Sequence, residues 1–185
     1  MVPAGTADVT PWRDWTSAAD AALQFLHSYL GWDVWLVTRV EGDRWIILRS
    51  HPSSVVEQGT ELAWDSSFCR QMHEGNAPRL ATVTAAVPAY AGRATGPLRG
   101  VAAYAGVPIV DADGRLFGTV CGLASRAQPR SATRDLPLVE LMARMLSTLL
   151  AAGVDPPPIP EPEPRLDRAL LERRVGGTHG DVTTP

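Results

Sequence analysis

The sequence contains no lysine, so every basic side chain apart from histidine is an arginine. The arginines are scattered along the chain, and we attribute the bias to a GC-rich genome, because an arginine-built phosphate site would require clustering. Cysteine is also scarce: Cys69 and Cys121 are the only two, and they lie far apart in the sequence. Without a CxxC pair the sequence shows no zinc or iron–sulfur site, and no structural disulfide is expected in what reads as a cytoplasmic chain.

Long apolar runs are absent too, since none reaches the roughly 18 residues that a membrane-spanning helix requires. The first residues, MVPAGTADVTPWRD, contain no basic segment followed by an apolar one, so no signal peptide is expected. A net charge of −3 gives no general attraction to nucleic acid or to an anionic membrane. The 185 residues, 45% of them hydrophobic, are enough for one domain with flanking tails.

The other parts of the chain are organised around residues 101–124. Two apolar runs flank the polar segment Asp111-Ala112-Asp113-Gly114-Arg115. An Asp-Gly pair between such runs is a strong β-hairpin signal, because glycine readily adopts the positive φ of the turn. The runs are rich in alanine and glycine, Gly106 among them, and small residues in a central strand let a helix or a ligand approach closely. Tyr104 and Cys121 are the chemically notable side chains of this hairpin.

Periodicity and turn residues predict the other elements: helices over 17–30, 65–75 and 135–152, and strands over 32–40, 44–50 and 79–83. Ser17 and Asp20 resemble a capping box at the start of the first helix. Asp65 or Ser66 is expected to cap the second helix, and Asp135 the third. The first two strands are joined by a short turn, which favours an antiparallel sheet over a doubly wound one.

Composition divides the chain into four parts. We expect a flexible N-terminus over 1–14, a domain over 15–152, a proline-rich linker over 153–164, and a short helix with a disordered tail over 165–185. The last helix of the domain has two apolar stripes. One can pack on the sheet, and the other favours a homodimer through a parallel pair of 135–152 helices; the alternative is that both stripes are buried within one domain. The tail is interpreted as a tether, a docking peptide for a protein partner, or the junction to an output domain.

The order of the elements and several short segments resemble a GAF domain of bacterial signalling proteins. Ser67-Phe68-Cys69 resembles the family's SFC segment, Tyr104-Ala105-Gly106-Val107-Pro108 its YAG-P strand, and Asp113-Gly114 with Gly118-Thr119-Val120-Cys121 its DG and GTLC strand. The resemblance covers roughly residues 15–152. It implies an α+β, PAS-related fold: a central antiparallel sheet of five or six strands, with helices on one face and pocket-forming loops on the other. It also implies a sensory or regulatory role that depends on a small-molecule ligand or on dimerisation.

The chemistry of the ligand stays open, and the cofactor is unknown at this point. The NKFDE motif of cyclic-nucleotide-binding GAF domains is absent. Bilin-binding GAF domains attach the chromophore through a cysteine that is often followed by histidine. Here Arg70 follows Cys69 and Gly122 follows Cys121, which argues against a covalent tetrapyrrole. Haem would need an axial histidine, and His73, the only one near the pocket elements, is interpreted as a solvated residue at a helix end.

The candidate ligand-binding residues come from the short helix, the irregular segment 85–98 and the hairpin. Phe68 and Met72 are expected to belong to the core. Tyr90 is the favoured ligand contact, because the irregular segment that carries it is interpreted as the lid of a pocket. The full set is Trp64, Phe68, Cys69, Met72, Tyr90, Tyr104, Gly106 and Cys121.

These observations favour a non-enzymatic sensory domain. A second hypothesis is a thiol-based redox sensor or reductase using Cys69, because a helix start and a neighbouring cation lower the pKa of a thiol. No resolving partner for Cys69 is evident in the sequence, and an isolated cysteine is more often a small buried apolar residue. A third hypothesis is a scaffold that docks a partner through its C-terminal tail.

Overall fold

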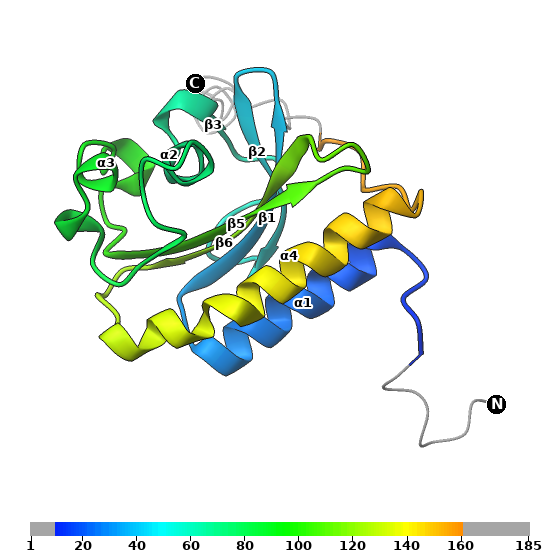
Figure 1. Cartoon of the computed structure of the whole chain (residues 1–185), viewed down its shortest axis with the longest axis horizontal. Helices are drawn as coiled ribbons and strands as arrows, with labels where there is room; N and C mark the ends of the chain where they lie inside the picture. Colours follow the sequence, from blue (N-terminus) through cyan, green and yellow to red (C-terminus); the bar gives the residue numbers. More distant parts are fainter. Residues whose placement is uncertain (1–9, 161–185) are drawn as a thin grey trace, which may run out of the picture.

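A six-stranded antiparallel sheet separates two apolar layers in the computed structural model, which describes residues 10–160 (Figure 1). The strand order is β3-β2-β1-β6-β5-β4. The α+β fold with a central antiparallel sheet is therefore as predicted, including the two hairpins. The strands are β1 (Val34–Glu41), β2 (Arg44–His51), β3 (Glu61–Ala63), β4 (Leu80–Ala81), β5 (Ala103–Val110) and β6 (Leu116–Ala124).

Helices α1 (Trp15–Leu30) and α4 (Leu136–Ala151) lie side by side on one face of the sheet (Figure 1). The predicted capping box is wrong: the Asp14 carboxylate accepts the Ser17 N–H at 2.7 Å, and Asp20 instead pairs with Arg49 on β2. Gly31 ends α1 with φ of 69°, a conformation that glycine adopts without strain.

Helix α4 turns its buried stripe of Val139, Ala143 and Leu146 toward the sheet. The second apolar stripe is half-buried and packs against the same core, at the edge of the helical layer. Leu141 differs, because 55% of it is exposed. Pro137 lies in the first turn of α4, and Asp135, the expected cap, occupies the cap position without making a side-chain cap hydrogen bond.

Short helical segments cover the opposite face of the sheet. They are η2 (Trp64–Ser66), α2 (Phe68–His73), η3 (Thr84–Ala86), α3 (Pro88–Ala91) and η4 (Gly96–Leu98). Ser67 caps α2 by accepting the Arg70 N–H at 3.1 Å, so the expectation of a cap by Asp65 or Ser66 is wrong by one or two positions. We refer to the covering segment 84–101, with η3, α3 and η4, as the lid segment.

Two hydrophobic cores result, one on each face of the sheet. Strand β1 shows the alternation most clearly: Trp35 and Val37 belong to the helical-face core, and Val34 and Leu36 to the loop-face core. Strand β3 is not among the strands predicted from the sequence, because its three residues are too few to show a period.

The helices and strands of the described residues fall between Trp15 and Ala151. Residues 153–160, which begin the predicted proline-rich linker, contain no helix or strand. The predicted short helix within 165–185 lies outside the described residues. Within residues 10–160, no helix has the length and apolar character required to cross a membrane.

Candidate functional site

A small cavity of about 10 Å³ lies between the sheet and the loop layer. Its volume is roughly that needed by one water molecule. Four of the eight residues predicted from the sequence line it, namely Phe68, Cys69, Tyr104 and Cys121. The other lining residues are Trp45, Leu62, Ser67, Leu98 and Leu123.

The two cysteines meet at this cavity as free, fully buried thiols. Cys69 comes from α2 and Cys121 from the middle of β6, opposite Gly106 in the sheet register. The Tyr104 hydroxyl and the Thr119 hydroxyl each donate a hydrogen bond to the Cys69 sulfur at 3.3 Å. The partner thiol that sequence reasoning missed for Cys69 is therefore Cys121.

The surroundings of the two thiols shift their pKa values in opposite directions. Burial raises the pKa of Cys69, but hydrogen bonds from Cys121, Thr119 and Tyr104, with the nearby Trp45 indole, outweigh burial and lower that pKa below its ordinary value. The hydrogen bond that Cys121 gives to Cys69, together with burial, raises the pKa of Cys121. Cys69 is accordingly the thiol of the pair that holds a thiolate more readily.

An indole N–H at the cavity has no hydrogen-bond partner in the described part of the chain. The Nε1 atom of Trp45 is buried and meets no acceptor in hydrogen-bonding geometry among residues 10–160, even though it lies near the Cys69 sulfur. Trp45 itself is only 4% exposed. A buried donor without an acceptor costs free energy. A ligand with an acceptor in this cavity would accept a hydrogen bond from the Trp45 indole and remove that cost.

An aromatic cluster of Phe68, Tyr90 and Tyr104 fills the space beside the cavity. Ring centroids lie 5.0 Å apart for Phe68 and Tyr90, 5.6 Å for Phe68 and Tyr104, and 5.0 Å for the two tyrosines. Tyr90 is fully buried, and its hydroxyl donates to the Pro78 carbonyl at 2.5 Å. In this conformation Tyr90, the favoured ligand contact, is a core residue that does not line the cavity.

The other sequence candidates occupy different places. Met72 is buried in the loop-face core, as expected for a packing residue. Trp64 is half-buried outside the cavity, and its ring faces that of the exposed His73 at 6.2 Å. Gly106 lies beneath the Tyr104 ring, where an added side chain would collide with it.

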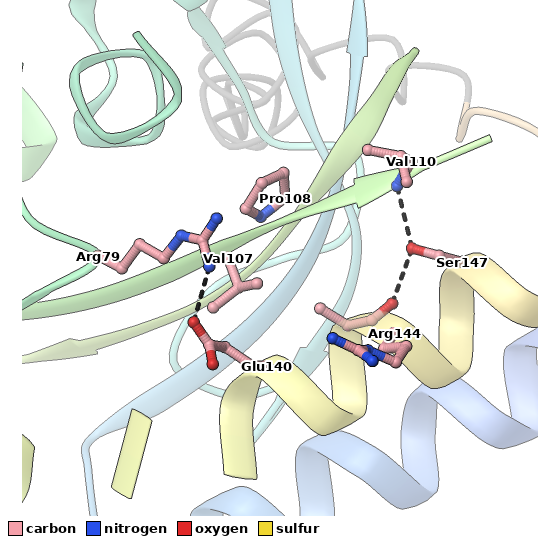
Figure 2. Close-up of a pocket in the computed structure, with 8 residues that line it drawn as sticks. Arg79, Val107, Pro108, Val110, Glu140, Arg144 and Ser147 are labelled. Atoms are coloured by element: carbon pink, nitrogen blue, oxygen red, sulfur yellow. Dashed lines mark hydrogen bonds and ion pairs between the residues drawn. The ribbon is translucent and has the colours of Figure 1, made fainter. Parts of the chain in front are cut away.

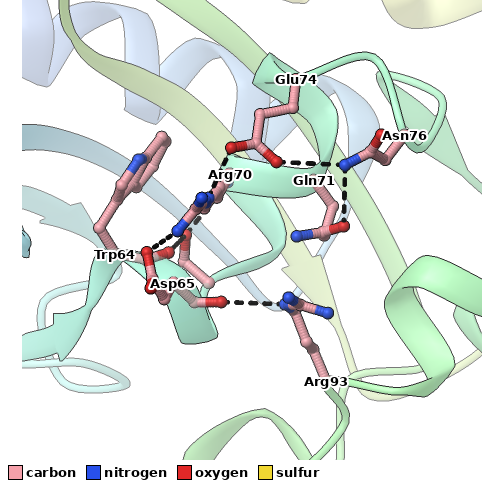
Figure 3. Close-up of polar contacts among 8 residues, drawn as sticks. Trp64, Asp65, Arg70, Gln71, Glu74, Asn76 and Arg93 are labelled. Atoms are coloured by element: carbon pink, nitrogen blue, oxygen red, sulfur yellow. Dashed lines mark hydrogen bonds and ion pairs between the residues drawn. The ribbon is translucent and has the colours of Figure 1, made fainter.

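The lid segment is held closed by Arg93 (Figure 3). The Arg93 Nε donates to the Asp65 carbonyl at 2.9 Å, which ties the end of α3 to η2. With its amide oxygen turned toward Arg93, the buried Gln71 accepts two further hydrogen bonds of 3.2 Å from the guanidinium. Arg70 braces the same corner through ion pairs with Asp65 and Glu74.

The comparisons agree with this architecture. A model of the GAF domain family matches residues 14–150. No curated protein matches the sequence.

Solved structures match at low sequence identity. The GAF domain of a phosphoenolpyruvate-protein phosphotransferase from Acinetobacter superposes with a TM-score of 0.63 and 11% identity, over 79% of this chain and 87% of that one. The free methionine-R-sulfoxide reductase from Neisseria meningitidis, solved with its substrate, gives 0.58 and 19% over 79% and 83%. The phytochrome photosensory core module of Stigmatella aurantiaca gives 0.58 and 15% over 76% and 33%, so this chain spans a third of that module. At these identities the likeness shows the fold.

Proposed function

The chain belongs to the GAF domain family, and from this we propose that it is a sensory domain in bacterial signal transduction that binds a small ligand beneath its lid segment. The observation that carries the proposal is the cavity between the sheet and the lid segment, with the unpartnered Trp45 indole N–H at its wall. The cavity is otherwise lined mainly by apolar and aromatic side chains. The lining suits a small apolar molecule with one hydrogen-bond acceptor directed at Trp45, once the cavity has been enlarged.

Binding requires the lid segment to move, because the closed cavity holds about 10 Å³. Leu98 in η4 lines the cavity from the lid side. A displacement of η4 would enlarge the cavity without unpacking the sheet. The ligand then acts by population shift, favouring the open arrangement in which its contacts exist.

Strand β5 offers a route from the cavity to α4. Tyr104 faces the cavity from β5, and the Val110 N–H of the same strand donates to the Ser147 hydroxyl on α4 at 3.0 Å. A change in the position of Tyr104 would therefore act on the strand to which α4 is hydrogen-bonded. We propose that α4 carries the signal, through a homodimer formed along it or to an output partner reached through the C-terminal tail.

The residues present do not fit a bilin, the covalent tetrapyrrole that the sequence argues against. Admitting a tetrapyrrole would require Phe68, Tyr90 and Tyr104, which pack against one another, to leave the core together. A small ligand requires movement of η4 alone. His73 is exposed and lies outside the cavity lining, so the residues do not fit axial haem ligation there either.

Native mass spectrometry of freshly purified protein, with an absorption spectrum, is the first test. A colourless mass excess supports a bound metabolite, and a visible absorption band contradicts the size argument against a chromophore. The second test is an NMR titration with cyclopentanone, which has an acceptor, and with cyclopentane, which has none. We expect cyclopentanone to shift the Trp45 indole resonance and to bind more weakly to Trp45→Phe; equal binding of the two probes would refute the role given to Trp45.

A second candidate function, a thiol redox sensor, is favoured by the position of Cys69 and Cys121 as two free thiols in the lining of one small cavity. With a hydroperoxide as oxidant, the Cys69 thiolate attacks one peroxide oxygen, which gives a Cys69 sulfenic acid and releases an alcohol or water. The Cys121 thiol then attacks the Cys69 sulfur, a disulfide forms, and water leaves. Cys69→Ser should abolish this reaction, because it removes the attacking thiol, and the intact mass of peroxide-treated protein measures whether the disulfide has formed.

A further inference from the structure

A groove of about 250 Å³ lies on the other side of the sheet, between α4 and the outer edge of β5 (Figure 2). Its walls include two arginines, Arg79 before β4 and Arg144 on α4, which are far apart in the sequence. The fold thus brings two of the arginines that are scattered in the sequence to one groove. The remaining lining residues are Val107, Pro108, Val110, Glu140, Ala143 and Ser147.

The strand edge that forms one wall is closed to pairing with another strand. The outward N–H of Gly106 donates to the Arg79 carbonyl at 2.7 Å, and that of Val110 donates to the Ser147 hydroxyl at 3.0 Å. Pro108, between them, has no N–H to offer. An added strand would find no free donor along this edge, so the groove suits a small molecule better than an extended peptide.

The charged side chains in the groove determine what charge a ligand should carry. Arg79 and Glu140 form an ion pair at 2.7 Å (Figure 2). The guanidinium of Arg144 makes no hydrogen bond or ion pair with any described residue, although Glu140 and Ser147 lie on the same face of α4. The groove therefore has one unmatched positive charge, and the carboxylate of Glu140 opposes a second negative charge on a ligand.

We propose that this groove binds a small organic monocarboxylate. Its carboxylate accepts two parallel hydrogen bonds from the planar guanidinium of Arg144. Its apolar part lies on Val107, Pro108, Val110 and Ala143. A ligand in this position contacts both β5 and α4, so it is a second input to the helix that we propose carries the signal.

Benzoate and its neutral isostere benzamide test the proposal on the full chain by NMR titration. We expect benzoate to shift the amide resonances of Val107, Val110 and Ser147. Benzamide should bind at least about tenfold more weakly than benzoate. Arg144→Gln should weaken benzoate about tenfold, and Arg144→Lys should give an intermediate loss because it keeps the charge without the fork. Arg115→Gln, at the exposed turn between β5 and β6, is the matched control.

Three results would overturn the proposal. The first is an absence of shifts at these amides in saturating benzoate. The second is equal benzoate binding by the wild type and a folded Arg144→Gln variant, with folding checked by its melting curve. The third is binding of inorganic phosphate as tight as that of benzoate and equally dependent on Arg144, which would mean a general anion site.

Discussion

The ring of Tyr104 occupies the space that a side chain at Gly106 would take. The two residues lie two positions apart on β5 and face the same side of the sheet, and a Cβ at position 106 would overlap the Tyr104 hydroxyl and its ring. Because position 106 is glycine, the Tyr104 ring lies against the strand and its hydroxyl reaches the Cys69 sulfur at 3.3 Å. The glycine of the YAG-P segment thus positions the donor of the thiol site.

Gly106→Ala is expected to displace the Tyr104 ring and break its hydrogen bond to Cys69. We expect a loss of about 1–3 kcal/mol in the free energy of unfolding, typical of overpacking in a closed core. Urea denaturation measures this loss. The pKa of the Cys69 thiol should rise toward its ordinary value, which alkylation rates against pH would detect.

Gly100→Ala is the matched control, because no atom lies within 4 Å of the added Cβ and its φ is not in the left-handed region. The control should match the wild type in stability. If Gly106→Ala were equally neutral, the ring would have another position available, and the account of Gly106 would be wrong.

The fold could be predicted largely because its signals are local. The alternation of β1, the Asp113-Gly114 turn and Gly31 after α1 are each determined by a few adjacent residues. The contact between Cys69 and Cys121 could not be predicted, because it depends on where α2 lies over the register of β6. The same holds for Arg79 and Arg144, which the fold brings to one groove.

The burial of Tyr90 shows another limit of sequence reasoning. An irregular segment rich in small residues was expected to be an exposed lid, and most of its residues are at least partly exposed. Tyr90 nevertheless turns inward, because the Pro78 carbonyl satisfies its hydroxyl inside the core. Hydrophobic periodicity cannot identify a buried residue of this kind, because Tyr90 is a single residue in a segment without regular structure.

Tyr90→Phe is expected to change the stability of the protein at alkaline pH. Burial, with the nearby Cys69 charge as a smaller cause, raises the pKa of Tyr90 in the folded state well above its ordinary value of 10.0. The unfolded chain therefore releases the Tyr90 proton first as the pH rises. The free energy of unfolding then falls above about pH 10, by up to about 1.4 kcal/mol per pH unit for this residue.

Urea denaturation between about pH 8 and pH 11 checks this dependence. Tyr90→Phe should be about 1 kcal/mol less stable at neutral pH, because it loses the hydrogen bond to Pro78. Its stability should then fall less steeply with pH than that of the wild type. Tyr29→Phe, at a position 66% exposed, should reproduce the wild-type slope, and parallel curves for Tyr90→Phe would contradict the prediction.

Arg93→Gln is expected to loosen the lid segment without unfolding the domain. The variant loses the hydrogen bond to the Asp65 carbonyl and those to Gln71. One such bond contributes about 1 kcal/mol to closure, so opening should become at least roughly fivefold more frequent. Hydrogen–deuterium exchange over residues 87–101 measures the effect, and cyclopentanone affinity should rise with the open population.

Arg99→Gln is the control, because Arg99 lies in the same segment with no side-chain partner among the described residues. Unchanged exchange in Arg93→Gln would show that Arg93 does not hold the segment closed.

Leu141→Asp is expected to dissociate the proposed homodimer. Leu141 is the most exposed large apolar residue of α4, at 55%, and an aspartate there would leave a charge in a helix-to-helix interface. A central apolar residue of such an interface contributes about 2 kcal/mol, so the dimer should weaken roughly thirtyfold. Sedimentation velocity measures the dissociation, and a cooperative melting transition shows that the variant is still folded, because the side chain is solvated in the monomer. Val55→Asp, at a loop position 52% exposed, should leave the dimer intact. A wild-type protein that sediments as a monomer at every concentration would refute the homodimer and favour a signal passed through the C-terminal tail to a different partner.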